Sequence, residues 1–233
     1  MQVKQAAAAA GTLALGGDLA VNRMGFGAMR ITGPGILGEP RDVPAAKALL
    51  RRAVELGVNF MDTAHAYGPE VSERLLGETL APADGVVVAT KGGLVRRGRA
   101  WVPDGRPESL RRQCERSLEL LRLERIDVYQ LHTIDRRVGL EASVEALARL
   151  RDEGKIRHVG LSNVSEDELA RARRIVPVVS VQNRYSLAER RWDRLVDVCE
   201  RDGLAFVPWY PLAAGDLPAR RVRLGAVAER YGA

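Results

Sequence analysis

The chain has 233 residues, of which 46% are hydrophobic and 28% are charged, and its formal net charge is +6. This composition is that of an ordinary globular protein and excludes a disordered or membrane-embedded chain. No apolar run approaches the roughly 18 residues that a membrane span needs, and the alanine-rich start lacks a basic region of the secretory kind. We therefore expect a cytoplasmic protein with no membrane partner, folded as a single domain over residues 1–233.

The basic charge fits either nucleic-acid binding or a site for a phosphorylated small molecule. Arginines are spread along predicted helices, where they alternate with glutamate beside an apolar stripe, which is typical of a solvated helix face. The densest basic cluster, residues 96–101, lies in a predicted loop without a known nucleic-acid-binding motif. We expect no nucleic-acid partner, and the sequence sets no expectation for the oligomeric state. Cys114 and Cys199 lack metal-ligand spacing, which indicates reduced, buried thiols and no metal site.

Short apolar runs alternate with segments of helical periodicity along the chain. Residues 12–25 contain two such runs around a Gly-Gly-Asp turn and predict a hairpin. Seven strand-like runs then follow, at 24–29, 58–62, 86–91, 126–132, 156–163, 178–183 and 204–209. Helical patterns lie between them, at 45–57, 70–80, 108–122, 141–154, 166–175 and 191–203. Gly57, Gly154 and Gly203 stand where three of these helices should end, because glycine accepts the left-handed C-terminal conformation.

Strands this apolar need cover on both faces, which implies a parallel sheet. Seven strand-helix units leave two arrangements, an open doubly wound sheet and a closed (β/α)8 barrel. An open dinucleotide-binding sheet would show GxGxxG opening the first helix, whereas here a long loop follows the first strand and the helix begins only near Pro44. We therefore predict an α/β fold of the (β/α)8, or TIM, barrel class, with the 12–25 hairpin closing its N-terminal end.

Active sites of such barrels form at the C-terminal ends of the strands. Polar or aromatic residues follow successive predicted strands at these ends: Asp62 and Tyr67, Lys91, His132, Ser162 and Asn163, Gln182 and Asn183, and Trp209. Each residue alone has an ordinary structural explanation, such as a helix cap or a buried imidazole. Together they indicate a site, because every such group has a desolvation cost unless it is paired.

The chemistry of this set favours proton transfer. Lys91 is tolerable at the end of a buried strand if Asp62, one strand away, neutralises it. The pKa of a free tyrosine is about 10, which is high for an acid near neutrality, and we expect the ammonium to lower it for Tyr67. His132 would give a second hydrogen bond to a substrate oxygen, which fits reduction of a carbonyl.

Several segments resemble the aldo-keto reductases: GVNFMDTAHAYG (57–68), VVVATKGG (86–93), DVYQLH (127–132), GKIRHVGLSN (154–163), VQNRYS (181–186) and WYPLAAG (209–215). The resemblance implies a barrel enzyme that reduces an aldehyde or ketone, its small-molecule partner, with NADPH. It also implies a catalytic tetrad of Asp62, Tyr67, Lys91 and His132, with Tyr67 as proton donor.

The same resemblance implies a cofactor site. Ser162, Asn163 and Gln182 match positions that hold the nicotinamide carboxamide, and Trp209 matches the aromatic residue that stacks on the nicotinamide ring. The segment from Leu212 through Gly215 to Asp216 matches the loop that folds over the cofactor pyrophosphate, and Tyr210, next to Trp209, is also expected to bind the cofactor.

Members of this family usually have longer chains, and we expect a C-terminally truncated member that lacks the eighth strand, the last helix and the basic loop for the 2′-phosphate. Two sheet edges would then be open. An alternative is a catalytically impaired truncated barrel that serves as a nucleotide-binding or interaction module. A Schiff-base enzyme using Lys91 is a further alternative, against which Asp62 and Tyr67 argue. The long loops at 33–43, 94–106 and 133–139 should set the substrate.

Overall fold

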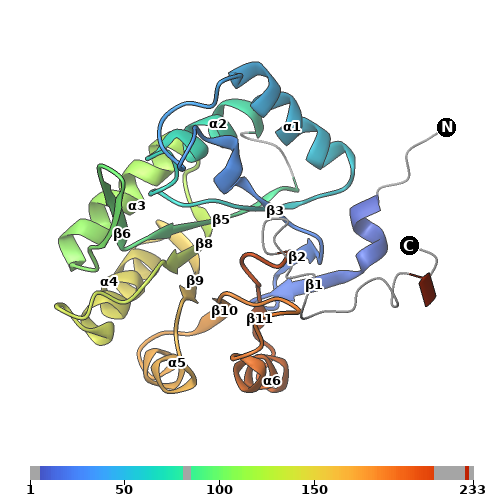
Figure 1. The fold of residues 1–233 in the computed structure, drawn as a ribbon. Coiled ribbons are helices and arrows are strands. Elements are labelled where there is room, and N and C mark those ends of the chain that lie inside the picture. Colours follow the sequence, from blue (N-terminus) through green and yellow to red (C-terminus); the bar gives the residue numbers. More distant parts are fainter. Residues whose placement is uncertain (1–5, 81–84, 213–228, 231–233) are drawn as a thin grey trace.

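The computed structural model describes residues 6–80, 85–212 and 229–230. Its centre is a seven-stranded parallel sheet that curls on itself, with the helices on its outer side (Figure 1). The strands, in order across the sheet, are β3 (Phe26–Gly27), β4 (Phe60–Asp62), β5 (Val87–Gly92), β8 (Ile126–Leu131), β9 (Ile156–Ser162), β10 (Val178–Gln182) and β11 (Ala205–Phe206). Every neighbouring pair is parallel. The predicted barrel class is thereby confirmed.

Six α-helices connect the strands: α1 (Val43–Glu55), α2 (Val71–Leu80), α3 (Pro107–Leu121), α4 (Leu140–Asp152), α5 (Glu166–Arg173) and α6 (Asp193–Arg201). Short 3-10 helices, η1 (Ala6–Ala10) and η2 (Ala28–Ile31), precede α1. The Asp42 carboxylate caps α1 by accepting from the Ala45 N–H at 2.8 Å, and Ser165 with Glu168 forms a capping box on α5. Gly57, Gly154 and Gly203 have positive φ, as predicted for helix ends.

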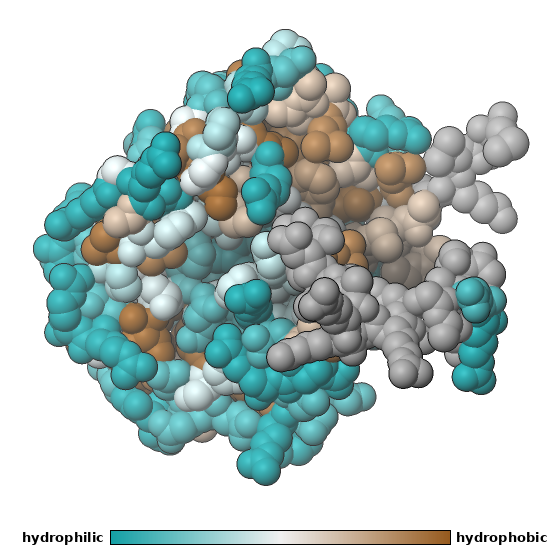
Figure 2. All heavy atoms as spheres, viewed as in Figure 1, coloured by the Kyte–Doolittle hydropathy of each residue, from teal (hydrophilic) through white to brown (hydrophobic). Residues whose placement is uncertain are grey.

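One leucine from each helix illustrates how the outer layer packs on the sheet. These residues are no more than 1% exposed: Leu50, Leu75, Leu110, Leu147, Leu169 and Leu195. Full burial of such a side chain stabilises the fold by about 1.5–3 kcal/mol. Figure 2 shows polar residues over the outer rim and a hydrophobic area beside α1.

The N-terminal hairpin closes the end of the barrel where the strands begin, as predicted. Strands β1 (Thr12–Leu15) and β2 (Leu19–Asn22) pair antiparallel. Their apolar side chains form one buried cluster with residues of the barrel strands: Leu15, Leu19, Val21, Phe60, Val87, Ala89, Val128, Val179 and Ala205. Asn59, just before β4, fixes the hairpin by accepting from the Asn22 N–H at 2.7 Å and donating to the Ala20 carbonyl at 3.1 Å.

The predicted loop at 94–106 is wrong in part, because it contains a second hairpin. Strands β6 (Leu94–Arg97) and β7 (Ala100–Pro103) pair antiparallel, with Arg96 opposite Trp101. Gly98 makes the turn with a φ of 57°.

Within the described residues, β3 and β11 are the two ends of the sheet. The expected lack of an eighth strand and a last helix concerns a part of the chain outside these residues, and it stays a prediction. No helix of the described part is long and apolar enough to cross a membrane. The described residues also contain no cluster of metal-binding side chains, and both cysteines are buried and free.

Candidate active site

Lys91 and Asp62 form a buried ion pair at the C-terminal ends of neighbouring strands β5 and β4. The Lys91 side chain is 1% exposed. Its Nζ donates to both Asp62 oxygens, at 2.9 and 2.8 Å, and to the Thr63 carbonyl at 2.8 Å. All three ammonium hydrogens therefore have acceptors, which is the condition for burying a cation.

The charge of Lys91 persists in this environment. Burial is the largest single influence on its pKa and lowers it, but the Asp62 carboxylate and the Tyr67 phenol together outweigh burial. The pKa of Lys91 is consequently raised above its ordinary value of 10.5. Lys91 is a fixed cation at neutral pH and not a neutral amine nucleophile, which argues against a Schiff-base role.

Tyr67 follows β4 and places its ring beside this cation. The ring centroid lies 5.2 Å from Lys91 Nζ, and the residue is 7% exposed. The predicted fall in the pKa of Tyr67 is wrong. The ammonium does lower this pKa, but the sum of all influences raises it. Burial is the largest influence and raises the pKa above 10, Lys91 offsets part of this rise, and Asp62 adds to it. Tyr67 is therefore a protonated phenol at neutral pH, the form that a proton donor requires.

His132 follows β8 and completes the predicted tetrad. Its ring packs edge-on against Tyr67 with centroids 5.8 Å apart. Burial and the Lys91 charge hold its pKa well below 6.5, so that the imidazole is neutral. His132 Nδ1 is buried without a partner among the described residues. Since an unpaired buried N–H costs more than an unpaired acceptor, the ring proton belongs on Nε2.

Asn163 organises the neighbouring wall at the end of β9. It adopts a left-handed conformation, with a φ of 59°. Its Nδ2 donates to the His132 carbonyl and to Ser162 Oγ, at 3.0 Å each. Its Oδ1 accepts from the Trp209 indole N–H at 3.1 Å. The predicted cofactor residues Ser162, Asn163 and Trp209 thus lie in one hydrogen-bonded group beside His132.

Gln182, at the end of β10, contacts the predicted tetrad directly. Its Nε2 donates to Asp62 Oδ1 at 2.9 Å, and Gln130 Nε2 approaches the same oxygen at 3.4 Å. Gln182 therefore also orients the carboxylate that holds Lys91. The sequence had indicated only a contact with the cofactor.

The remaining predicted cofactor residues lie along the segment that follows β11. The Tyr210 ring lies 6.2 Å from that of Trp209, and the Arg184 guanidinium lies 5.8 and 5.3 Å from the Trp209 and Tyr210 rings. Leu212 is 69% exposed. Gly215 and Asp216 fall outside the described residues, so their roles stay predictions.

Asn183, predicted at a strand end beside Gln182, and Trp101, which the sequence did not single out, shape the geometry of the site. The Asn183 side chain accepts from the Val164 N–H at 3.1 Å and donates to the Val164 carbonyl at 2.7 Å, which fixes the backbone after Asn163. Trp101 of β7 packs edge-on against Tyr67 with centroids 6.3 Å apart. The Asn after Gln182 was visible in the sequence, whereas the contact of Trp101 depends on the unpredicted hairpin.

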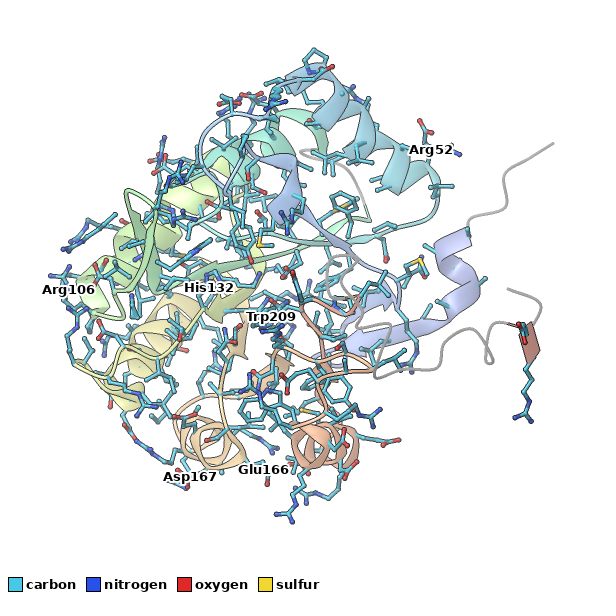
Figure 3. All side chains as sticks on the ribbon, viewed as in Figure 1. Arg52, Arg106, His132, Glu166, Asp167 and Trp209 are labelled. Atoms are coloured by element: carbon cyan, nitrogen blue, oxygen red, sulfur yellow. The ribbon has the colours of Figure 1, made fainter. Side chains whose placement is uncertain are left out.

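Arg96 stacks over Trp101, with its guanidinium 3.9 Å from the ring centroid. The same guanidinium donates to the Arg99 carbonyl at 3.1 Å. Figure 3 shows His132 and Trp209 toward the middle of the molecule and Arg52, Arg106, Glu166 and Asp167 at its periphery. His132 and Trp209, each hydrogen-bonded to Asn163, therefore lie away from the charged rim.

A parallel barrel with Asp, Tyr, Lys and His gathered at its strand ends defines a class of oxidoreductases, and the comparisons agree with that class. The chain matches the Aldo/keto reductase family over residues 23–230. It belongs to this family, as the sequence motifs predict.

Named relatives support the same assignment. An uncharacterized oxidoreductase of Schizosaccharomyces pombe is 49% identical over 224 residues, which cover 96% of this chain and 73% of the relative. Pyridoxine 4-dehydrogenase of Escherichia coli is 39% identical over 226 residues, with 93% of this chain and 78% of the relative covered. The structure of an aldo-keto reductase from Klebsiella pneumoniae in complex with NADPH superposes with a TM-score of 0.78 at 26% identity, covering 95% of this chain and 76% of the other.

Proposed function

We propose that this protein reduces an aldehyde or ketone to an alcohol with NADPH as cofactor and Tyr67 as proton donor. Membership of the aldo/keto reductase family supports the reaction class, and the NADPH complex of a similar structure supports the cofactor. The observation that carries the proposal is the Lys91 ammonium, held by both Asp62 oxygens, with the Tyr67 ring 5.2 Å away. These supports favour an enzyme over a module that only binds nucleotides.

The residues beside His132 fit a nicotinamide. The side chain of Asn163, an exposed residue, forms one hydrogen-bonded group with the Ser162 hydroxyl and the Trp209 indole. An aromatic face next to amide and hydroxyl groups suits a planar ring that bears a carboxamide. These residues and Gln182 would hold the cofactor, and the nicotinamide, when bound, would supply the hydride.

The protein's own part in the reaction is to bind, polarise and protonate the carbonyl oxygen. The neutral His132 would donate an N–H to that oxygen, and the protonated Tyr67 would donate its O–H to the same atom. As the Tyr67 proton leaves, the Lys91 ammonium stabilises the phenolate that remains. Asp62 would keep the ammonium charged and in place throughout the reaction, because both of its carboxylate oxygens accept hydrogen bonds from Lys91 Nζ.

Substitution of Tyr67 by phenylalanine tests the proposal. Purified chain is mixed with NADPH and 4-nitrobenzaldehyde, and the loss of absorbance of the reduced nicotinamide gives the rate. We expect Tyr67→Phe to lower kcat by at least about a hundredfold, because general acid catalysis contributes roughly 10²–10⁴. Binding of NADPH should remain close to that of the unsubstituted protein.

Tyr185→Phe is the matched control, because this tyrosine bonds to Asp193 away from the tetrad. Its rate should be unchanged. Equal turnover of Tyr67→Phe and the unsubstituted protein would refute the role of Tyr67. A folded protein that binds NADPH but does not turn over any aldehyde would favour the nucleotide-binding alternative.

An aromatic aldehyde is a reasoned first substrate. Trp101 packs against Tyr67, so that an aromatic side chain lies beside the proton donor. A relative at 39% identity is named for its action on pyridoxine, a heteroaromatic alcohol. The cytoplasmic location, the single domain over residues 1–233 and the lack of a nucleic-acid partner belong to this proposal too, and they rest on composition and length.

A further inference from the structure

Glu73 is a completely buried carboxyl group on the outer side of the sheet, beneath the catalytic residues. It lies in the first turn of α2 and has 0% exposure. Its Oε1 accepts from the Thr90 hydroxyl at 2.5 Å. Thr90 immediately precedes Lys91 in β5, and successive strand residues point to opposite faces of a sheet. Glu73 therefore contacts the strand of the catalytic lysine from behind.

The second oxygen of Glu73 faces His65, which lies between Asp62 and Tyr67 in the sequence. Glu73 Oε2 and His65 Nδ1 are 3.8 Å apart. Both atoms are buried, and neither makes a hydrogen bond of normal geometry among the described residues. The Ser117 hydroxyl, which is likewise unpaired there, also acts on Glu73. Two orphaned polar atoms that face one another at this distance need less than about 1 Å of movement to form a hydrogen bond.

His65 is tied to the catalytic strand through its backbone as well. Its N–H donates to the Lys91 carbonyl at 3.1 Å, and its carbonyl accepts from the Glu70 N–H at 2.9 Å. The segment that carries Tyr67 thus contacts the strand that carries Lys91 through His65. Glu73 spans both sides of that contact, because it contacts Thr90 with one oxygen and faces His65 with the other.

We propose that Glu73 is a positioning residue that shares one proton with His65 and so holds the segment bearing Tyr67 against the strand bearing Lys91. The catalytic consequence rests on the function proposed above. Below neutral pH the carboxylic acid keeps its proton and donates a hydrogen bond to His65 Nδ1. As the pH rises, the pair releases one proton to water, and the ring proton of His65 moves to Nδ1, where it donates to the carboxylate.

The surroundings of the pair support this titration. Burial raises the pKa of Glu73 to about 7, against the lowering effect of the Thr90 and Ser117 hydroxyls. Burial lowers the pKa of His65, so its ring is neutral. Other titratable or charged groups act on the pair from each element around it: Glu70 before α2, Lys91 in β5, Cys114 and Arg116 in α3, and Tyr129 in β8.

Nitrogen NMR of the imidazoles tests the shared proton without any need for activity. The chain has three histidines, so the His65 signals are identified by their loss in His65→Gln. In the unsubstituted protein we expect His65 Nδ1 to change from an acceptor-type to a donor-type shift with a midpoint near pH 7. In Glu73→Gln, which keeps the shape but does not titrate, this transition should be absent.

Kinetics test the positioning role, and Glu78→Gln is the matched control. Glu78 lies on the same helix but pairs at the surface with Lys47 and Arg74. We expect Glu73→Gln to lower kcat about tenfold with KM within about twofold and to remove an inflection near pH 7, because it displaces reacting groups without touching substrate. Glu78→Gln should show neither effect.

The two readouts separate this inference from the function proposed above. A His65 transition that persists in Glu73→Gln overturns the shared proton. An unchanged kcat and pH profile in that variant overturns the positioning role. Should Glu73→Gln fail to fold, the unsubstituted protein decides: a His65 signal that does not change between pH 5.5 and 8.5 overturns the proposal. A protein without turnover but with the His65 transition would contradict only the proposed function.

Discussion

Removal of Asp62 should leave the Lys91 ammonium buried without its counter-ion. Two of the three hydrogen bonds of Lys91 Nζ are to Asp62 oxygens, and the third is to the Thr63 carbonyl. Loss of one partner from such a pair typically costs about 3–5 kcal/mol of unfolding free energy. The cost of the unpaired charge has a ceiling, because a lysine of ordinary pKa can be neutralised at pH 7 for about 5 kcal/mol. We therefore expect Asp62→Ala to destabilise the fold by about 3–5 kcal/mol.

The pH dependence of this loss follows from the sign of the pKa change. In Asp62→Ala the pKa of folded Lys91 should fall below that of the unfolded chain, so the folded state binds fewer protons than the unfolded state. The stability of the variant then increases as the pH rises from the lowered folded value toward about 10.5. Its deficit relative to the unsubstituted protein should shrink between pH 7 and pH 9.5. In the unsubstituted protein the pKa of Lys91 is raised, and the stability due to the pair is lost only above pH 10.5.

Urea unfolding followed by circular dichroism at pH 7 and pH 9.5 measures these differences. The double variant Asp62→Ala/Lys91→Met removes the charge together with its partner and should recover most of the loss. A loss below about 1 kcal/mol at pH 7 in the single variant would refute the reasoning. So would a double variant no more stable than Asp62→Ala.

Three further substitutions test other parts of the structure. Lys91→Met should lower kcat by about 10²–10⁴. In alcohol oxidation, where Tyr67 accepts a proton, the remaining activity should shift to higher pH, and an unchanged pH profile would contradict the role of the ammonium. Trp209→Ala should weaken NADPH binding about two- to tenfold by calorimetry, since ring stacking contributes about 0.5–1.5 kcal/mol; unaltered affinity would exclude the stacking role. Gly77→Ala should lower the melting temperature by an amount equivalent to about 2 kcal/mol, because the added Cβ overlaps the Leu120 carbonyl oxygen. A higher melting temperature, as helix propensity alone predicts, would show that α2 and α3 move apart enough to accommodate the added methyl group.

Much of the fold could be predicted from the sequence because apolar runs and glycine stops repeat along it. The seven predicted strands contain six of the seven strands of the sheet, and β5 extends one residue past its predicted end. The six predicted helices agree with the observed ones within a few residues. The placement of Asp62 and Lys91 was also predictable, since the ends of neighbouring parallel strands meet at one edge.

Other features depend on burial and partners that a sequence does not specify. The pKa of Tyr67 was predicted to fall, but its burial outweighs the nearby cation. Glu73 is an ordinary residue of an amphipathic helix by sequence, and only the packing of α2 on the sheet removes it from water. The hairpin at 94–103 was missed because its two short strands contain charged residues and pair only with each other.

The hairpin β1–β2 seals the end of the barrel where the strands begin with apolar side chains. Leu15 and Val21 of the hairpin lie in one buried cluster with strand residues such as Val128. A chain of water molecules cannot cross such a floor, because it offers no polar partners. On the proposed mechanism, the proton that restores Tyr67 after each turnover therefore does not pass through this end of the barrel.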